Sequence, residues 1–413
     1  MSAITKTAKT DSKVSSRNHL EGCVPRLRFP GFKGEWSTAP LRHFFTKSKS
    51  RNKDFRVNNV ITNSAEYGLV AQSEFFDKDI AIEENTESYY IIHKGDFVYN
   101  PRKSKAAPFG PFNRYEKIED GIVSPLYTCL NPLSNINNDY LAWYFRGSVW
   151  HRYVYDNGSQ GARHDRVNMT DDLLFGIPIR YPQSKEQAHI ADFLFTLESR
   201  IIAQRRLVEL LKKHKRGLIR SVFSRKLSTG EKWYKYRLDE IAEVNPSTIN
   251  LPDKFLYIDL ESVSDGVWHE KKIIQKSDAP SRAQRVVSVG DILFQMVRPY
   301  QQNNLHISTS SELPVVASTG YAQIRTNQNS SFLYWLLHSP EFLKKVLVRC
   351  TGSSYPAINS TDLKEIYISI PSIESQNRYA QILNDISQKC IAEELVISKL
   401  ETLKNGLLQQ LFI

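Results

Sequence analysis

The stretch VELLKKHKRGLIRSVF occupies Val208–Phe223, near the middle of a chain of 413 residues. The same pattern returns as ISKLETLKNGLLQQLF at Ile397–Phe412. Leu211 of the first copy becomes Leu400 of the second, a shift of 189 residues. The first copy is strongly basic and the second is not. The recurrence indicates that the chain contains a duplication, and it raises the question of why only one copy carries the charge.

Both stretches lie in longer segments with the alternating 4–3 spacing that is typical of a coiled-coil seam. The seam passes through Ile190, Leu194, Leu197, Ile201, Gln204, Val208, Leu211, Lys215, Leu218 and Val222 in the first copy. In the second copy it passes through Tyr379, Leu383, Ile386, Cys390, Glu393, Ile397, Leu400, Lys404, Leu407 and Leu411. Polar residues interrupt both seams at the same two places (Gln204 and Lys215; Glu393 and Lys404). Such interruptions lower stability but fix the register of paired helices.

The flanks of the two segments carry opposite charges. The first segment carries Arg205, Arg206, Lys212, Lys213, Arg216 and Arg220, and the second carries Glu374, Asp385, Glu393, Glu394 and Glu401. Opposite flanks favour pairing of the two helices with each other. We therefore expect an intramolecular antiparallel coiled coil, with DNA contact by the basic face as a secondary role. Gly217 and Gly406 would each cost roughly 1 kcal/mol inside a helix; close helix approach would justify that cost, and a helix end is the alternative.

The duplication extends to the intervening sequence. YYIIHKGDFVYNPRK from Tyr89 resembles QRVVSVGDILFQMVRP from Gln284, and each predicts a β-hairpin around a Gly-Asp turn. YLAWYFRG from Tyr140 matches FLYWLLHS from Phe332, and a Gly-Ser loop follows each short helix. The predicted fold is α+β, with two pseudo-symmetric globular α/β domains separated by two long helices that form an antiparallel coiled coil. The expected divisions are a disordered tail at 1–24, domains at 25–182 and 229–371, and helices at 183–228 and 372–413.

Composition limits the class of partner. The net charge of +11 and the sequence pI of about 9.3 favour a polyanion, most simply nucleic acid. The sequence contains no run of roughly 18 apolar residues, so a membrane span is not expected. Cys23, Cys129, Cys350 and Cys390 are far apart and form no CxxC pair, which fits a reducing, cytoplasmic location.

The sequence lacks the motifs of the common catalytic and cofactor sites. It contains no GxxxxGK[ST] loop, no GxGxxG after a strand and no HExxH pair. We therefore expect a binding protein that is not an enzyme and that holds no cofactor or metal of its own.

The residues expected to contact DNA fall in two loops of each copy, where donors and cations could reach base edges and phosphates. In the first copy they are Arg102, Lys103 and Lys105 after the predicted hairpin, and Ser159, Gln160, Arg163, His164 and Arg166 in the Gly-Ser loop. In the second copy they are Arg298, Tyr300, Gln301, Gln302, Asn303 and Asn304, with Ser353, Ser354 and Tyr355 in the Gly-Ser loop. The alternative for each single residue is an ordinary solvated loop side chain.

PRLRFPGFKGEW at Pro25–Trp36, the LKNGLLQQLF segment and the domain–helix–domain–helix order together resemble the specificity subunit of type I restriction–modification systems. The resemblance implies two target recognition domains that each read one half of a split, asymmetric sequence in double-stranded DNA. It also implies that the helices are a spacer and a docking surface for two modification subunits, which bind S-adenosylmethionine and methylate adenine. Restriction subunits that use ATP and magnesium would join the same assembly, and this chain would supply sequence choice without catalysis.

Two other functions stay open at this point. A stand-alone sequence-specific DNA-binding regulator would bind tightly by itself and would need no docking surface on its helices. A coiled-coil scaffold with two protein-binding modules would show no steep salt dependence with DNA. A neighbouring reading frame for an adenine methyltransferase would favour the restriction–modification interpretation over both.

Overall fold

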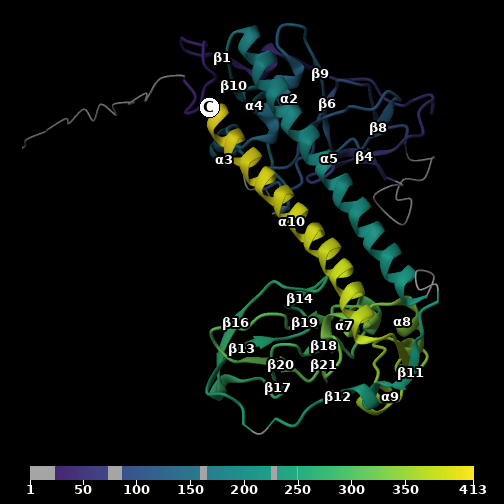
Figure 1. Ribbon diagram of the computed structural model, residues 1–413. Coiled ribbons are helices and arrows are strands. Elements are labelled where there is room, and N and C mark those ends of the chain that lie inside the picture. The colour runs from purple at the N-terminus through teal and green to yellow at the C-terminus, as the bar shows by residue number, and fades with distance from the viewer. Residues whose placement is uncertain (1–23, 73–85, 159–164, 225–229, 249) are drawn as a thin grey trace, which may run out of the picture. The chain divides into compact units, whose positions relative to one another are not determined.

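The two long helices are divided between two compact units. The computed structural model describes residues 24–72, 86–158, 165–224, 230–248 and 250–413 (Figure 1). The first unit comprises Met1–Ile202 and Ser398–Ile413, and the second comprises Ala203–Ile397. Helices α5 (Ser184–Phe223) and α10 (Ile373–Leu411) therefore each contribute to both units, and the prediction of two long helices is confirmed. The predicted tail lies outside the described residues except for Val24.

Among its described residues, the first unit contains one four-stranded sheet with order β2-β9-β6-β7, and three two-stranded pairs, β1-β10, β3-β4 and β5-β8. Its strands are β1 (Ser37–Pro40), β2 (Phe45–Lys47), β3 (Ile61–Ser64), β4 (Gly68–Ala71), β5 (Tyr90–Ile92), β6 (Phe97–Tyr99), β7 (Phe112–Arg114), β8 (Gly121–Val123), β9 (Thr128–Pro132) and β10 (Pro178–Tyr181). Its short helices are η1 (Leu41–His43), α2 (Asn138–Arg146), α3 (His151–Asn157) and α4 (Asp171–Phe175).

The part of the second unit that the structure describes contains two four-stranded sheets, β12-β21-β18-β19 and β16-β13-β20-β17, with the pairs β11-β22 and β14-β15. Its strands are β11 (Tyr234–Arg237), β12 (Ala242–Val244), β13 (Lys254–Ile258), β14 (Val263–Ser264), β15 (Val267–Trp268), β16 (Lys272–Gln275), β17 (Ala283–Val287), β18 (Ile292–Gln295), β19 (Leu305–His306), β20 (Val315–Ser318), β21 (Tyr321–Thr326) and β22 (Tyr367–Ile370). Its short helices are α6 (Leu238–Ile241), η3 (Lys276–Asp278), η4 (Pro299–Gln301), α7 (Ser330–Leu337), α8 (Pro340–Leu347) and α9 (Ser360–Lys364).

The sheet orders show that the units are copies of one plan. The first strand of each unit pairs antiparallel with its last, β1 with β10 and β11 with β22. The sheet β2-β9-β6-β7 has the same sequence of connections as β12-β21-β18-β19. The helices α2, α3 and α4 correspond in order to α7, α8 and α9. The predicted duplicated α+β fold is confirmed.

The predicted hairpins at the Gly-Asp turns are wrong. Strand β5 pairs with β8 whereas β6 pairs with β7 and β9, so the turn connects two different sheets. The second copy does the same, because β17 pairs with β20 and β18 pairs with β19 and β21. The aspartates Asp96 and Asp291 are buried, and each accepts a hydrogen bond from the backbone N–H of the residue three positions before it. An apolar–turn–apolar pattern does not reveal which strand a run will pair with.

In each unit the beginning of one long helix packs beside the end of the other. In the first unit, Ile190 and Leu194 of α5 share a core with Leu408, Leu411 and Phe412 from the end of the sequence. The second unit repeats this with Ile219 and Val222 of α5 against Tyr379, Ala380 and Leu383 of α10. Low-numbered residues of one helix therefore meet high-numbered residues of the other, which is antiparallel pairing. All twenty predicted seam positions are buried or half-buried.

The polar seam residues have specific partners. Gln204 donates through Nε2 to a carboxylate oxygen of Glu393, so the two equivalent interruptions of the repeat meet each other. The other interruption behaves differently in the two copies. Lys404 forms an ion pair with Glu198 at 2.7 Å in the first unit, whereas Lys215 lies 5.8 Å from the ring centroid of Trp335 in the second. The opposite flanking charges meet at Lys212 and Glu394, 2.7 Å apart.

A buried glutamine attaches the start of each long helix to the globular part of its unit. Gln187 accepts from the backbone N–H of Asn137, the cap of α2, and donates to the carbonyl of Pro182. Gln376 makes the same two bonds, to Asn329 before α7 and to the carbonyl of Pro371. Both glutamines are at most 3% exposed. Unpaired buried amides are costly, so each bond pair fixes the direction in which the helix leaves its unit.

Neither explanation of the helix glycines is correct. Both helices continue well beyond Gly217 and Gly406, so the glycines do not mark helix ends. A Cβ atom added at either position would meet no other described atom within 4 Å, so the helices do not approach closely there. No helix within the described residues is both long and apolar enough to cross a membrane.

The Gln204–Glu393 pair gives a test of the seam. Replacing only Gln204 with Leu should destabilise the chain by roughly 1–3 kcal/mol, because the Glu393 carboxylate loses its donor in a half-buried site. The double variant Gln204→Leu/Glu393→Leu should recover that loss or exceed wild-type stability. Urea unfolding of the four members of the double-mutant cycle measures both effects. Additive losses from the two substitutions would show that the side chains do not face each other.

Candidate nucleic-acid interface

In the first unit, the two predicted DNA-contacting loops lie side by side. Arg102 and Arg166 form an isolated antiparallel bridge. The backbone N–H of Lys103 donates to the carbonyl of Asp165 at 2.8 Å, and that of Val167 donates to the carbonyl of Pro101 at 2.8 Å. The segment after β6 and the end of the Gly-Ser loop therefore form one surface. Lys105 is exposed beside it, whereas Ser159, Gln160, Arg163 and His164 lie outside the described residues.

Arg166 has unused hydrogen-bonding capacity on this surface. Its Nε atom is buried and has no hydrogen-bond partner in the described part of the chain. The nearest carboxylate oxygen, from Asp165, is 3.9 Å away. A buried donor without a partner is costly in an isolated protein. An acceptor supplied from outside the chain would remove that cost.

The second unit brings its corresponding loops together in the same way. Val297 forms a bridge with Ala357, and the N–H of Arg298 donates to the carbonyl of Pro356 at 2.7 Å. The guanidinium carbon of Arg298 lies 4.2 Å from the ring centroid of Tyr355. A stacked guanidinium keeps its N–H donors directed outward. Ser353, Ser354 and Tyr355 are all exposed next to it.

The segment Arg298–Asn304 has a strained backbone conformation. Arg298 and Gln302 both have φ of +53°, in the left-handed region that non-glycine residues rarely adopt. The buried Gln295 holds the loop, because its Nε2 donates to Oε1 of Gln301 and its Oε1 accepts from the N–H of Asn303. Such strain persists only where surrounding contacts determine it, and it is frequent at functional sites.

The loop divides the predicted base readers into an outer and an inner group. Tyr300 and Gln301 are exposed. Asn304 is 1% exposed, its Oδ1 accepts from the N–H of Gln295, and its Nδ2 faces His338. In this conformation Asn304 supports the loop from inside and is not positioned to reach DNA. Sequence reasoning missed Gln295, whose only signal was a polar residue at the end of a strongly apolar strand.

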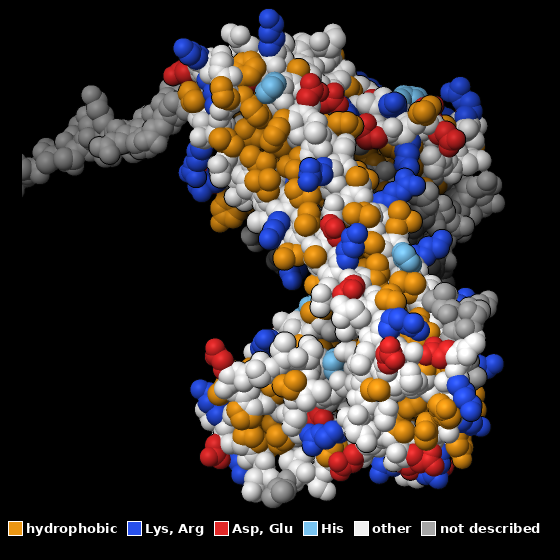
Figure 2. Space-filling model, in the orientation of Figure 1, with side chains coloured by type: hydrophobic (Ala, Val, Ile, Leu, Met, Phe, Trp, Pro, Cys, Tyr) orange, Lys and Arg blue, Asp and Glu red, His pale blue; other side chains and the backbone are white. Residues whose placement is uncertain are grey.

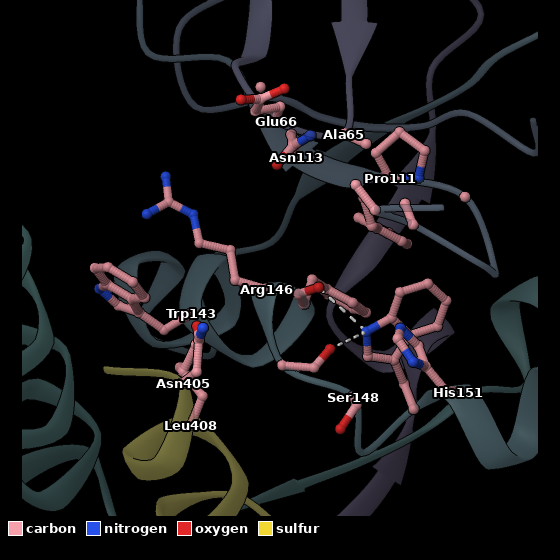
Figure 3. A pocket seen from close by; sticks show the side chains of 18 of the residues that line it. Ala65, Glu66, Pro111, Asn113, Trp143, Arg146, Ser148, His151, Asn405 and Leu408 are labelled. Carbon is pink, nitrogen blue, oxygen red and sulfur yellow. Dashed lines mark hydrogen bonds between the residues drawn. The ribbon is translucent and has the colours of Figure 1, made fainter. Parts of the chain in front are cut away.

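A cleft opens in each unit between the short aromatic helix and a long helix. In the first unit its volume is about 560 Å³. Arg146 and His151 lie on one side of it, and Glu66 and Asn113 lie across from them, with Asn405 of α10 below (Figure 3). The desolvated guanidinium of Arg146 has a lowered pKa, and it lies 4.6 Å from the ring centroid of Trp143.

The cleft of the second unit, about 700 Å³, has equivalent walls but a different charge. Trp335 and His338 of the α7 region take the places of Trp143 and Arg146. The α5 side contributes Lys212, Lys213, Lys215, Arg216, Gly217, Ile219 and Arg220, and Gln301, Gln302 and Asp265 complete the lining. The predicted DNA-contacting loop and the basic helix thus share one cleft.

Part of the chain is similar to known DNA specificity domains. The family model described as the type I restriction modification DNA specificity domain matches residues 230–402. The specificity subunit of the type I restriction enzyme HindI from Haemophilus influenzae is 24% identical over 189 residues, 44% of this chain and 41% of that protein. The MjaVIII specificity subunit from Methanocaldococcus jannaschii is 24% identical over 241 residues, 52% and 57% respectively. The chain spans about half the length of these relatives.

Solved structures extend the likeness of fold to nearly the whole chain. A type I restriction-modification system S subunit from M. genitalium superposes with a TM-score of 0.56 at 15% identity, covering 94% of this chain and 99% of that one. A chain from a study of assembly and conformational transition in the type I R-M system gives the same TM-score and coverage at 17% identity. These structures show the likeness of fold, and residues 230–402 match the type I restriction modification DNA specificity domain, so the predicted resemblance to specificity subunits is confirmed.

His338 makes the cleft of the second unit sensitive to pH. Desolvation, aided by the charge of Lys215, lowers the pKa of His338 to about 4, although a hydrogen bond between its ring and the carbonyl of Tyr334 opposes the shift. A depressed folded-state pKa contributes stability above the unfolded value of 6.5, and this contribution is lost as the pH falls toward 4. We expect a loss of roughly 2 kcal/mol between neutral pH and pH 5.

Chemical unfolding at pH 7 and pH 5 measures this loss. The His338→Asn variant, which keeps a donor for the Tyr334 carbonyl, should show a smaller difference between the two pH values. Equal pH dependence in the variant and the wild type would assign the effect to other groups.

Proposed function

We propose that the chain is the sequence-specific DNA recognition subunit of a type I restriction–modification complex, reading a split, asymmetric target. One observation carries the proposal. In both units, backbone bonds join the loop after the central strand (β6 or β18) to the end of the Gly-Ser loop, so the same two-loop surface occurs twice. The match of residues 230–402 to a DNA specificity domain supports the same conclusion.

The two surfaces present different chemistry, so the two half-sites should differ. The first unit offers the cations Arg102, Lys103 and Arg166. The second offers Tyr300 and Gln301 beside the stacked pair of Arg298 and Tyr355. Arginine suits the O6 and N7 acceptors of guanine, and glutamine suits the N6 and N7 edge of adenine. Each unit reads its half-site through its own loops.

The long helices offer a surface for partner proteins. Large apolar side chains are exposed along them: Phe193, Phe195, Ile202, Leu207 and Leu210 on α5, and Ile373, Ile382, Ile391, Leu395 and Leu403 on α10. Figure 2 shows such side chains among basic ones on the visible face. Exposed apolar stripes are typical of protein–protein contacts. We assign them to two modification subunits, which would bring S-adenosylmethionine, with restriction subunits bringing ATP and magnesium.

The direct test is methylation by the purified components. The chain alone should transfer no methyl group to DNA, because in this proposal it contributes no catalytic residue. Adding its modification subunit and S-adenosylmethionine should produce adenine methylation at one split sequence, read out by sequencing of modified bases. Methyl transfer by the chain alone, or methylation without sequence preference in the mixture, would contradict the proposal.

Loop variants then assign the half-sites. Tyr300→Ala/Gln301→Ala should relax one half of the methylated sequence, with a loss of roughly 1–3 kcal/mol for each good base contact. Arg102→Ala/Arg166→Ala should affect the other half, or weaken all binding if these arginines contact phosphates. Equal change in both halves with the first variant would contradict independent recognition by the two units.

A further inference from the structure

The two clefts are copies of each other, which allows a position-by-position comparison. Lys215, Arg216, Ile219 and Arg220 line the cleft of the second unit, and their equivalents Lys404, Asn405, Leu408 and Gln409 line that of the first. The tryptophans Trp143 and Trp335 occupy matching walls. The duplication therefore preserved the shape of the cleft while its chemistry changed.

A helix-interior glycine lies at the same place in both copies. Gly217 is exposed in the cleft lining of the second unit, seven residues from the last residue of α5 counted inclusively. A Cβ atom there would meet no described atom within 4 Å, so packing inside the chain does not require glycine. Glycine destabilises a helix interior relative to alanine. Its advantage at an open surface is that another molecule can approach the backbone closely.

Cations surround Gly217 on one face of α5. Lys213, Arg216 and Arg220 are spaced three and four residues apart, so they lie on the same side of the helix as the glycine. All three are exposed, and none has a carboxylate within salt-bridge distance among the described residues. Lys212, by contrast, is paired with Glu394 and Asp265. The charge of this face is therefore available to an outside anion.

The first unit lacks this charge. The equivalents of Lys213, Arg216 and Arg220 are Thr402, Asn405 and Gln409. The lysine shared by the two copies is neutralised in the first, where Lys404 pairs with Glu198. The residue that would correspond to Glu198 in the second copy is Ser387, so Lys215 lies beside Trp335 and has no ion pair with a carboxylate of the described residues.

We propose that a backbone phosphate of the DNA half-site read by the second unit seats against α5 at Gly217, held by Lys213, Arg216 and Arg220, and that the first unit has no such seat. This proposal rests on the proposed function, and it adds the location of one DNA contact and the chemical group, a phosphate, that makes it. Gln301 lines the same cleft, so the phosphate contact and a predicted base reader would share one surface. Phosphate contacts fix the register of a protein on the duplex, and base contacts specify the sequence.

The experiment measures binding of the assembled complex, chain plus modification subunit, to its methylation target over a range of salt concentrations. Gly217→Leu should weaken binding at least tenfold, because the side chain fills the space of the phosphate. The same change should keep or raise the thermal midpoint, because leucine is a better helix former than glycine. A Lys213→Gln/Arg216→Gln/Arg220→Gln variant should lower the slope of log Kd against log salt by about 0.9 for each phosphate that the variant no longer neutralises.

Gly406→Leu is the matched control, and it should bind within twofold of wild type. Target DNA scanned with single neutral methylphosphonate linkages should contain a position that weakens the wild-type complex but not the triple variant. The proposed phosphate contact is overturned if the two glycine variants lose equal affinity for the DNA target. It is also overturned if Gly217→Leu binds the target as tightly as the wild type. Loss of the modification subunit from the Gly217→Leu complex also overturns it, in favour of a protein contact. Absence of sequence-specific binding by the wild-type complex overturns the proposed function as well.

Discussion

The fold depends on one kind of contact that occurs in both units. The C-terminal end of each long helix packs into a hydrophobic core whose other residues come from other parts of the sequence. Phe412 lies with its ring centroid 5.3 Å from that of Tyr140, more than two hundred residues earlier. In the second unit, Phe223 lies 5.4 Å from Phe332, the residue equivalent to Tyr140. Each globular part therefore acquires its last core residues from a helix. The first unit crosses the linear order of the chain, because Ser398–Ile413 completes a core that Met1–Ile202 begins, whereas the second unit is the continuous segment Ala203–Ile397.

Periodicity predicted the helices and their seam because a 4–3 pattern constrains a whole helix at once. The strand pairing was not predictable in the same way. The Gly-Asp turns at Asp96 and Asp291 look like hairpins in sequence, but each aspartate holds its turn internally while the flanking strands join different sheets. The sequence also did not reveal that Gln187 and Gln376 are buried, since a polar residue on a helix ordinarily indicates a solvated face.

The DNA-contacting loops stay a prediction, and the structure shows how their residues are arranged. Matching positions in the two copies located the loops in the sequence, and the bridges at Arg102 and Val297 bring the two loops of each unit together, which the sequence did not indicate. Within the loops, the difference between a reader and a support depends on burial. Asn304 and Gln301 are nearly adjacent amides, yet one is interior and the other exposed. Residue type alone does not separate these roles.

The unequal charge of the two repeats follows from the same geometry. Lys212 of α5 is paired with Glu394 of the acidic helix, whereas Lys213, Arg216 and Arg220 line the cleft. Pairing of the helices therefore explains part of the charge, and the proposed phosphate contact at Gly217 would account for the cations that line the cleft. A duplication preserves the scaffold, while surface positions that carry no packing role are free to diverge between the copies.

The central claim, that each helix end completes the core of its own unit, is tested most directly by hydrogen exchange measured by mass spectrometry on two matched variants. Phe412→Ala removes a nearly fully buried ring and should reduce protection in α2 and in the β1–β10 pair, with little change in α7 and β11–β22. Phe223→Ala should do the reverse, reducing protection around α7 and leaving α2 unchanged. If Phe412→Ala loosened only the last turn of α10, or if each variant loosened both units equally, the helix ends would not be integral parts of the separate cores.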